Sequence, residues 1–228
     1  MANKAEPLVD GLTLVESAYL QIRHRILDNI WAPGYQALEQ EIALQLGMSR
    51  TPVHEALMRL ASESLVEVAP RRGMRVLPVS PTDMKEIYEV LTALESMAAE
   101  LLAARKPTDA ELQPLIEATE AMERALQADD LDAWARADES FHEKLVVMAG
   151  NRLLRESVMS YWDRAHRARM FTLRLRPKPV NSTQEHMDLV ARLRQGDAAG
   201  AAAVNRSHRE RASGELLTIF EKFRLQQM

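Results

Sequence analysis

Two sets of residues in this sequence have types and spacings that could do chemistry, and the first lies in the second half of the chain. Asp138 and His142 stand four positions apart in ADESFHEKL, so a helix would place both on one face. His186 lies about ten residues before the turn at Gly196 and His208 about eleven after it, which is about 15 to 17 Å along each helix. If these helices are antiparallel, a bundle can bring all four side chains to one point.

Three imidazoles and a carboxylate are a ligand set for a divalent metal ion. The set suits Zn, Ni, Mn or Fe(II) better than Mg or Ca. In octahedral coordination, two positions stay open for water or for the carboxylate of a ligand. The residues alone leave a structural interpretation open, because Asp-x-x-x-His arises by chance on many helices and a single histidine is more often a surface or hydrogen-bonded core residue.

The second set lies in LGMSRTPVHEALMRL, residues 46–60. Gly47 can end one helix in a left-handed conformation, Ser49 can cap the next, and Pro52 falls in its first turn, where a missing N–H does no harm. That helix would present Arg50 and Thr51 at its start, as a recognition helix does in the major groove of DNA. Arg50 could reach guanine or a phosphate, and Thr51 a phosphate. An ordinary helix start is the alternative.

Other polar residues in this part extend the DNA hypothesis. His54 and Arg59 lie off the apolar stripe of the same helix, and Arg71 and Arg72 lie at the tip of a predicted hairpin. The hairpin tip could enter a minor groove or hold the DNA backbone, or it could be a solvated turn.

The elements that would position the second set follow from periodicity and turn signals. Apolar residues at helical spacing predict three helices, at 14–30 (with Tyr19, Ile22, Ile26 and Ile30 on one face), at 38–46, and from Ser49 onward (with Val53, Ala56, Leu57 and Leu60 buried). Alternating apolar residues predict a two-stranded hairpin at 66–79. Three helices and a hairpin form a winged helix-turn-helix domain at 14–79, preceded by a flexible arm at 1–13.

From residue 80 onward the sequence predicts only helices, so we expect a mostly α fold with an all-α bundle at 80–228. The predicted helices are 81–105, 109–127, 130–149, 152–176, 183–195 and 198–225. Their starts carry capping signals: Ser80 with Pro81, Thr108 with Glu111, and Ser182 with Glu185.

Composition indicates a globular protein rather than a strongly basic nucleic-acid binder. The 228 residues are 46% hydrophobic and 27% charged, with a net charge of −4. Residues 1–80 hold 8 Lys and Arg against 9 Asp and Glu, so a DNA-binding face would need its positive charge concentrated locally. Cysteine is absent, and we see no secretory signal or membrane-spanning run, so we expect a cytoplasmic protein that does not enter membranes.

The first part resembles the winged-helix domain of the GntR family of bacterial transcription regulators. IRHRILDNIWAPG at 22–34, the segment at 38–60, and LVEVAPRRGMRV at 65–76 carry the resemblance. It implies that Arg50, Thr51 and Arg72 contact operator DNA. The family usually has a second Arg where this chain has His54, and often an Arg where it has Gln40, which implies weaker phosphate contacts or a different base preference.

The second part resembles the all-helical FCD effector domain of the FadR-type branch. ALESMAAELLAA at 93–104, DESFHEKLVVMAGNRLL at 138–154, and the segment 185–208 carry this resemblance. Many members bind a divalent metal through an Asp, a His four residues later, and two further His. The resemblance therefore assigns these ligand roles to Asp138, His142, His186 and His208.

One departure from the FCD pattern concerns the effector. Relatives often carry an Arg, which could hold an anionic effector, at the position of Leu91. The segment 163–178 carries six Arg or Lys, and among them Arg164 and Arg167 could supply the anion contact instead. A solvated face or an interdomain surface is the alternative interpretation of this segment.

The expected protein is a ligand-controlled transcription regulator, a repressor by default, and not an enzyme. It would bind a short inverted repeat as a homodimer. A small organic acid would enter the helical domain and coordinate the metal. In one alternative, the metal itself is the signal. In another, the chain is a metalloenzyme, but it has no HExxH-type arrangement, nucleophile elbow or Gly-rich phosphate loop.

Overall fold

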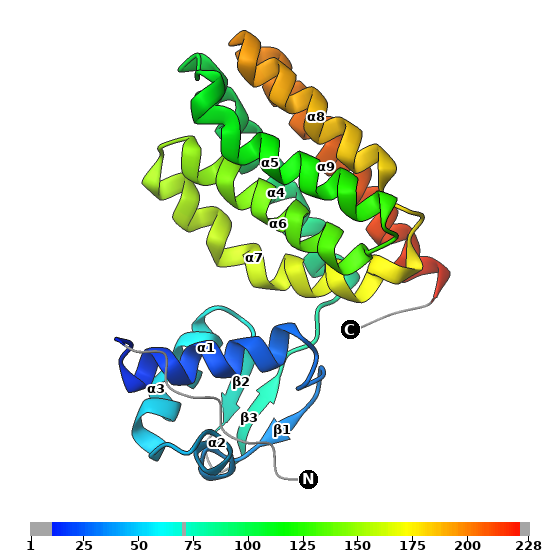
Figure 1. The fold of residues 1–228 in the computed structure, drawn as a ribbon. Helices are drawn as coiled ribbons and strands as arrows, with labels where there is room; N and C mark the ends of the chain where they lie inside the picture. Colours follow the sequence, from blue (N-terminus) through cyan, green and yellow to red (C-terminus); the bar gives the residue numbers. More distant parts are fainter. Residues whose placement is uncertain (1–10, 70–71, 224–228) are drawn as a thin grey trace. The chain divides into compact units, whose positions relative to one another are not determined.

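The computed structural model describes residues 11–69 and 72–223 of the chain. The chain divides between Val79 and Ser80 into two compact units, and each is described by itself. The fold is mostly α, as the sequence predicts: a small sheet with three helices in the first unit, and a helical bundle in the second (Figure 1).

The first unit is a winged helix-turn-helix. Its helices are α1 (Leu14–Leu27), α2 (Glu39–Leu46) and α3 (Arg50–Ser62), and its strands are β1 (Gln36–Ala37), β2 (Val66–Ala69) and β3 (Gly73–Val76). The predicted apolar stripe of α3 is fully buried, and it packs with Ile22 and Ile26 of α1 and Ile42 of α2. Gly47 ends α2 with φ 66°, as the sequence predicts, and Ser49 occupies the N-cap position of α3, although its side chain makes no capping hydrogen bond there.

The predicted two-stranded hairpin is a three-stranded sheet. Strand β3 lies between β2 and β1, and Gln36 and Ala37 pair with Arg75 and Met74 in antiparallel register. A two-residue strand shows no alternation in the sequence, which is why periodicity did not predict it. Strand β1 can approach β3 this closely only because residue 73 is a glycine. Gly73 has φ 76°, and a Cβ atom added there would lie 2.2 Å from the carbonyl oxygen of Ala37.

Helix α1 ends earlier than the sequence predicts. The apolar periodicity extends to Ile30, but the last helical residue is Leu27, and Asn29 adopts a left-handed conformation with φ 55°. Ile30 is consequently 58% exposed, and Trp31 fills the core instead and stacks on Tyr35 at 5.0 Å.

The second unit contains α4 (Pro81–Ala104), α5 (Asp109–Gln127), α6 (Leu131–Met148), α7 (Arg152–Thr172), a short 3-10 helix (Leu173–Leu175), α8 (Val180–Gln195) and α9 (Ala198–Lys222). Helix α4 packs against α9, α7, α6 and α8, so it is the central helix of the bundle. The predicted caps Ser80 and Thr108 accept hydrogen bonds from the N–H groups of Asp83 and Glu111. None of the described helices is long and apolar enough to cross a membrane.

Three predicted boundaries in this unit are wrong, the first being the end of α9 at Lys222 rather than at 225. Helix α7 ends at Thr172 and continues as the 3-10 turn, rather than as α-helix to residue 176. Helix α8 begins at Val180 rather than 183, so Ser182 and Glu185 lie inside the helix and do not form a capping box. Both side chains bind Arg211 of α9 instead, and this tertiary contact replaces the local one.

Candidate metal centre and nucleic-acid interface

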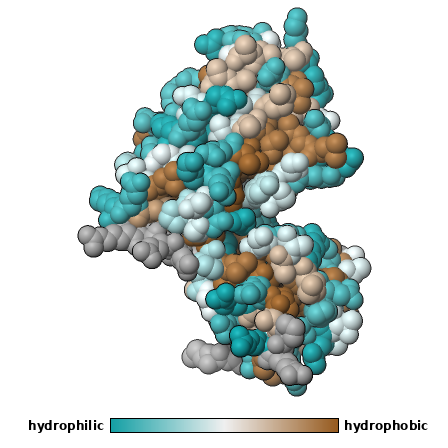
Figure 2. All heavy atoms as spheres, turned by 180° about the vertical axis from the view of Figure 1, so that it is seen from behind, coloured by the Kyte–Doolittle hydropathy of each residue, from teal (hydrophilic) through white to brown (hydrophobic). Residues whose placement is uncertain are grey.

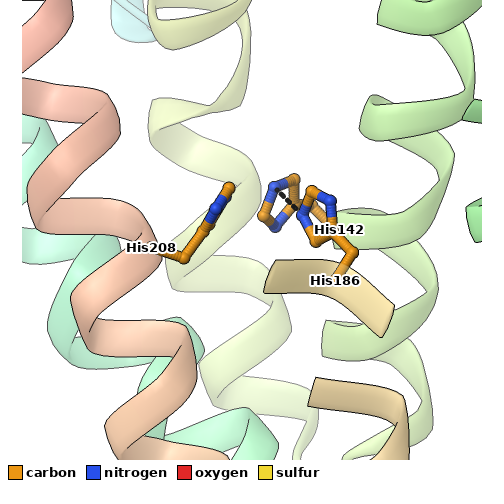
Figure 3. Close-up of side chains that lie close together, drawn as sticks. All are labelled: His142, His186 and His208. Atoms are coloured by element: carbon orange, nitrogen blue, oxygen red, sulfur yellow. Dashed lines mark hydrogen bonds between the residues drawn. The ribbon is translucent and has the colours of Figure 1, made fainter. Parts of the chain in front are cut away.

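Three histidines from three helices meet in the core of the second unit. The side chains of His142 on α6, His186 on α8 and His208 on α9 point toward one another, and the three residues are 0%, 1% and 4% exposed (Figure 3). One potential ligand atom from each lies within 4.8 Å of the others, and the Nε2 atoms of His142 and His186 are 3.2 Å apart. The antiparallel α8 and α9 place the rings of His186 and His208 at the same level, with centroids 4.5 Å apart.

Asp138 lies beside this cluster, one helical turn before His142. Its Oδ1 atom is 3.8 Å from Nε2 of both His142 and His186. Its other oxygen is 3.7 Å from Nη1 of Arg169 on α7. The structure thus brings together the four residues that the spacing argument selected, with the carboxylate slightly farther out than the histidines.

Burial sets the charge of the cluster. It lowers the pKa of His142 to about 4, and it lowers the pKa of both His186 and His208. Neutral imidazoles each keep one nitrogen lone pair that can bind a cation. At neutral pH the cluster therefore offers three neutral nitrogen donors and one carboxylate.

The side chains fit a metal ion. An ion about 2.0 to 2.1 Å from two imidazole nitrogens holds them about 2.8 to 3.4 Å apart, from the octahedral to the tetrahedral angle. The 3.2 Å between Nε2 of His142 and Nε2 of His186 falls in this interval. Without an ion, one of these two nitrogens has to be protonated to donate to the other, whereas a shared cation would take up the lone pairs of both.

A cavity of about 30 Å³ adjoins the cluster. Its lining includes Asp138, His142 and His208, together with residues that the sequence did not single out: Tyr88, Trp134, His166, Arg169, Arg176 and Arg209. Arg169 and Arg176 belong to the basic segment 163–178. The spacing of residues along the helix of Asp138 could not predict that they lie near the cluster, because they belong to other elements.

Arg164 and Arg167 are not among the residues that line this cavity. Arg164 binds Oδ1 of Asp83 at 2.8 Å near the start of α4. Arg167 is 3% exposed, and burial lowers its pKa to about 10. Their role in effector binding stays a prediction from the sequence.

On the first unit, the start of α3 presents an exposed polar face. Arg50, Thr51 and His54 are exposed. Glu39 of α2 joins two of them, because its carboxylate oxygens lie 3.2 Å from Nη2 of Arg50 and 2.8 Å from Nδ1 of His54. Hydrogen bonds from His54 and Arg50 lower the pKa of Glu39 although its burial opposes this shift, so the acid holds both side chains in place.

The other candidate DNA contacts differ in their surroundings. Arg59 binds Glu16 at 3.0 Å and Glu63 at 3.3 Å, and its guanidinium lies 3.6 Å from the ring centre of Tyr19. These contacts engage Arg59 within its own unit. Arg72 is exposed directly before Gly73, whereas Arg71 lies outside the described residues.

Comparison with known proteins identifies both units. The model of the gntR family of bacterial regulatory proteins matches residues 14–76, and the FCD domain model matches residues 86–211. The chain belongs to the GntR family and carries an FCD domain. It is therefore a transcriptional regulator with a DNA-binding helix-turn-helix, and not an enzyme.

The relatives agree with this assignment. An uncharacterized HTH-type transcriptional regulator from the TAR-I ttuE-ttuC' intergenic region of Agrobacterium vitis is 51% identical over 154 residues, which are 64% of this chain and 90% of that protein. The HTH-type transcriptional repressor RspR of Escherichia coli is 26% identical over 189 residues, or 82% of each chain. The structure of E. coli McbR/YncC shares the fold, with a TM-score of 0.77 and 24% identity over 92% of this chain and 99% of that one.

Proposed function

We propose that this GntR regulator holds a divalent metal ion in its FCD domain and that an organic-acid effector acts through that site. The observation that carries the proposal is the convergence of three buried, neutral histidines beside Asp138. When bound, the ion would supply positive charge and open coordination positions for an anionic ligand. The nitrogen-rich, thiolate-free ligand set favours Zn, Ni, Mn or Fe(II).

The effector would approach from the cavity side of the cluster. Arg169 and Arg176 line this cavity and could pair with a carboxylate, because an arginine fork matches the two oxygens. A cavity of about 30 Å³ has room only for water-sized groups. An effector therefore has to displace side chains of the lining when it enters. If the rearranged protein binds DNA with a different affinity, binding of the effector changes the affinity for DNA.

The start of α3 would contact operator DNA through Arg50, Thr51 and His54, with Arg59, Arg71 and Arg72 as further candidates. Exposed helix-start residues suit contact with base edges or phosphates. The relative RspR is named a repressor, and we expect repression here too.

An exposed apolar stripe on α4 supports a homodimer. Val90, Leu94, Met97 and Leu101 follow one another at helical spacing on the side of α4 away from the bundle core, and Val90 and Met97 are 38% and 45% exposed. The space-filling view also shows apolar side chains gathered on the surface of the helical unit (Figure 2). A two-fold dimer would cover such a stripe and match an inverted-repeat operator.

The metal content of the purified protein tests this function. We expect about one metal ion per chain in the wild type by mass spectrometry and little in a His186→Ala/His208→Ala variant. His24→Ala, an exposed histidine on α1, is the matched control and should keep the ion. Negligible metal in the wild type after reconstitution with Zn²⁺, Ni²⁺, Mn²⁺ and Fe²⁺ would refute the metal site.

The small cavity also favours a second candidate function, in which the metal itself is the signal. A cavity that admits only water-sized groups has room for a water molecule on an ion held by the histidines without any rearrangement. In this case, titration with metal alone would change DNA affinity. In the first proposal, the metal-bound protein changes its DNA affinity only when an organic acid is added.

A further inference from the structure

Two of the clustered histidines have a carboxylate behind them. Nδ1 of His208 lies 2.7 Å from Oε2 of Glu185 on α8, and Nδ1 of His142 lies 2.8 Å from Oε2 of Glu95 on α4. The contact between His208 and Glu185 has hydrogen-bond geometry. At His142 the distance is that of a hydrogen bond, but the ring N–H is not aligned with the oxygen. Glu185 therefore provides the sharper test.

Each carboxylate is in turn held by an arginine of α9. Arg211 donates to both oxygens of Glu185, at 2.7 and 2.5 Å. Arg209 donates from Nε to Oε2 of Glu95 at 2.9 Å and also contacts its other oxygen, with both side chains 2% exposed or less. A fork-shaped, charge-assisted contact of this kind fixes the orientation of a carboxylate.

These contacts bear on which ring nitrogen carries the proton. A carboxylate can only accept, so it favours the form of each histidine that carries its proton on Nδ1. The lone pair of Nε2 then points toward the other histidines. His186 differs, because its Nδ1 has no hydrogen-bond partner among the described residues and its ring packs at 4.3 Å from the ring of Phe141.

We propose that Glu185 and Glu95 are positioning residues, held by Arg211 and Arg209, which fix His208 and His142 in the metal-binding form. This inference rests on the proposed metal site. It goes further because it proposes that four residues outside the ligand set orient the metal ligands. Three of the four lie on the packed helices α4 and α9, so the packing of these helices would orient the metal ligands.

Zinc affinity measured by chelator competition tests Glu185 in the full-length protein. We expect Glu185→Ala to bind Zn²⁺ about 10- to 100-fold more weakly than the wild type, as is typical when such a partner is lost. Glu185→Gln keeps an acceptor for His208 and should lie between the two. Glu215→Ala is the matched control, because Glu215 binds Arg211 at 2.6 Å but touches none of the three histidines. It should change the affinity less than about 3-fold.

The protonation of the histidine rings gives a second readout that needs no metal. Long-range ¹H–¹⁵N spectra of metal-free protein should show His208 and His142 protonated on Nδ1, with His208 losing this preference in Glu185→Ala and His142 in Glu95→Ala. The proposal is overturned if both histidines carry their proton on Nε2, or if Glu185→Ala binds Zn²⁺ as tightly as the wild type. A wild type that shows the expected ring protonation but binds no Zn²⁺ would refute the proposed metal site while leaving the carboxylate assignment supported.

Discussion

At the scale of the residue, burial gives the clustered histidines a titration behaviour unlike that of free imidazole. In the metal-free protein, His142 has a pKa of about 4, whereas the unfolded chain binds the same proton near the ordinary histidine pKa of 6.5. The unfolded state therefore takes up the proton first as the pH falls. Stability is fully present above about pH 6.5 and declines as the pH falls toward about 4.

We predict that this decline amounts to about 1 to 3 kcal/mol for His142, since one pKa unit corresponds to about 1.4 kcal/mol. Denaturant unfolding of metal-free protein between pH 7 and 4 would measure it. A His142→Gln variant should show a flatter pH dependence. An identical slope in the variant and the wild type would contradict a buried, neutral His142.

Arg50 and Arg59 lie on the same helix, yet their contacts predict different roles. Arg50→Ala should weaken binding about 10- to 100-fold to a duplex that the wild type selects from a random pool, the range expected for one good base contact. Arg59→Ala should instead lower the stability of the first unit, because it removes contacts to Glu16, Glu63 and Tyr19. Fluorescence anisotropy and thermal unfolding separate the two effects. Equal losses of DNA affinity in both variants, at unchanged stability, would contradict this division.

At the scale of the element, the short sheet of the first unit depends on one glycine. Gly73→Ala must accept a left-handed φ and place its Cβ 2.2 Å from the carbonyl oxygen of Ala37. Gly34 is the matched control, because it has φ 82° but a Cβ added there would have no neighbouring atom within 4 Å. Gly34→Ala therefore introduces the strain of a left-handed φ but no steric conflict.

We predict that Gly34→Ala lowers the free energy of unfolding by about 1 kcal/mol and that Gly73→Ala lowers it by at least about 2 kcal/mol. The added steric conflict should push β1 away from β3. Chemical denaturation measures the two losses, and amide hydrogen exchange at Gln36 and Ala37 should be faster in Gly73→Ala alone. Equal losses in the two variants would show that the approach of β1 does not matter.

At the scale of the whole molecule, the apolar stripe on α4 predicts the oligomeric state. Met97→Glu places a charge in the middle of the stripe and should shift the protein from dimer to monomer in sedimentation velocity. Val180→Glu is the control, because Val180 is 55% exposed but lies on α8. A wild type that sediments as a monomer at micromolar concentration would rule out the dimer, and a dimeric Met97→Glu would place the interface elsewhere.

How far the fold could be predicted depended on the range of the interactions that cause it. Gly47, Ser80 and Thr108 act on backbone groups a few residues away, so their helix ends could be read from the sequence. Strand β1 and the side-chain contacts of Ser182 and Glu185 could not, because they depend on Met74, Arg75 and Arg211, which are distant along the chain. The same holds for the early end of α1, where Trp31 takes the place in the core that periodicity assigned to Ile30.

The sequence by itself determined the nine α-helices of the described residues, the two strands of the hairpin and the family. It also selected four residues on helices, and the rise per residue placed two of them at the same level. Only the tertiary structure decided what surrounds these residues. Glu95 and Arg209 are 114 positions apart and become partners only when α4 and α9 pack together. Local preferences follow from neighbouring residues and can be predicted from the sequence, whereas burial, ring orientation and the pairing of distant charges exist only after the helices have packed.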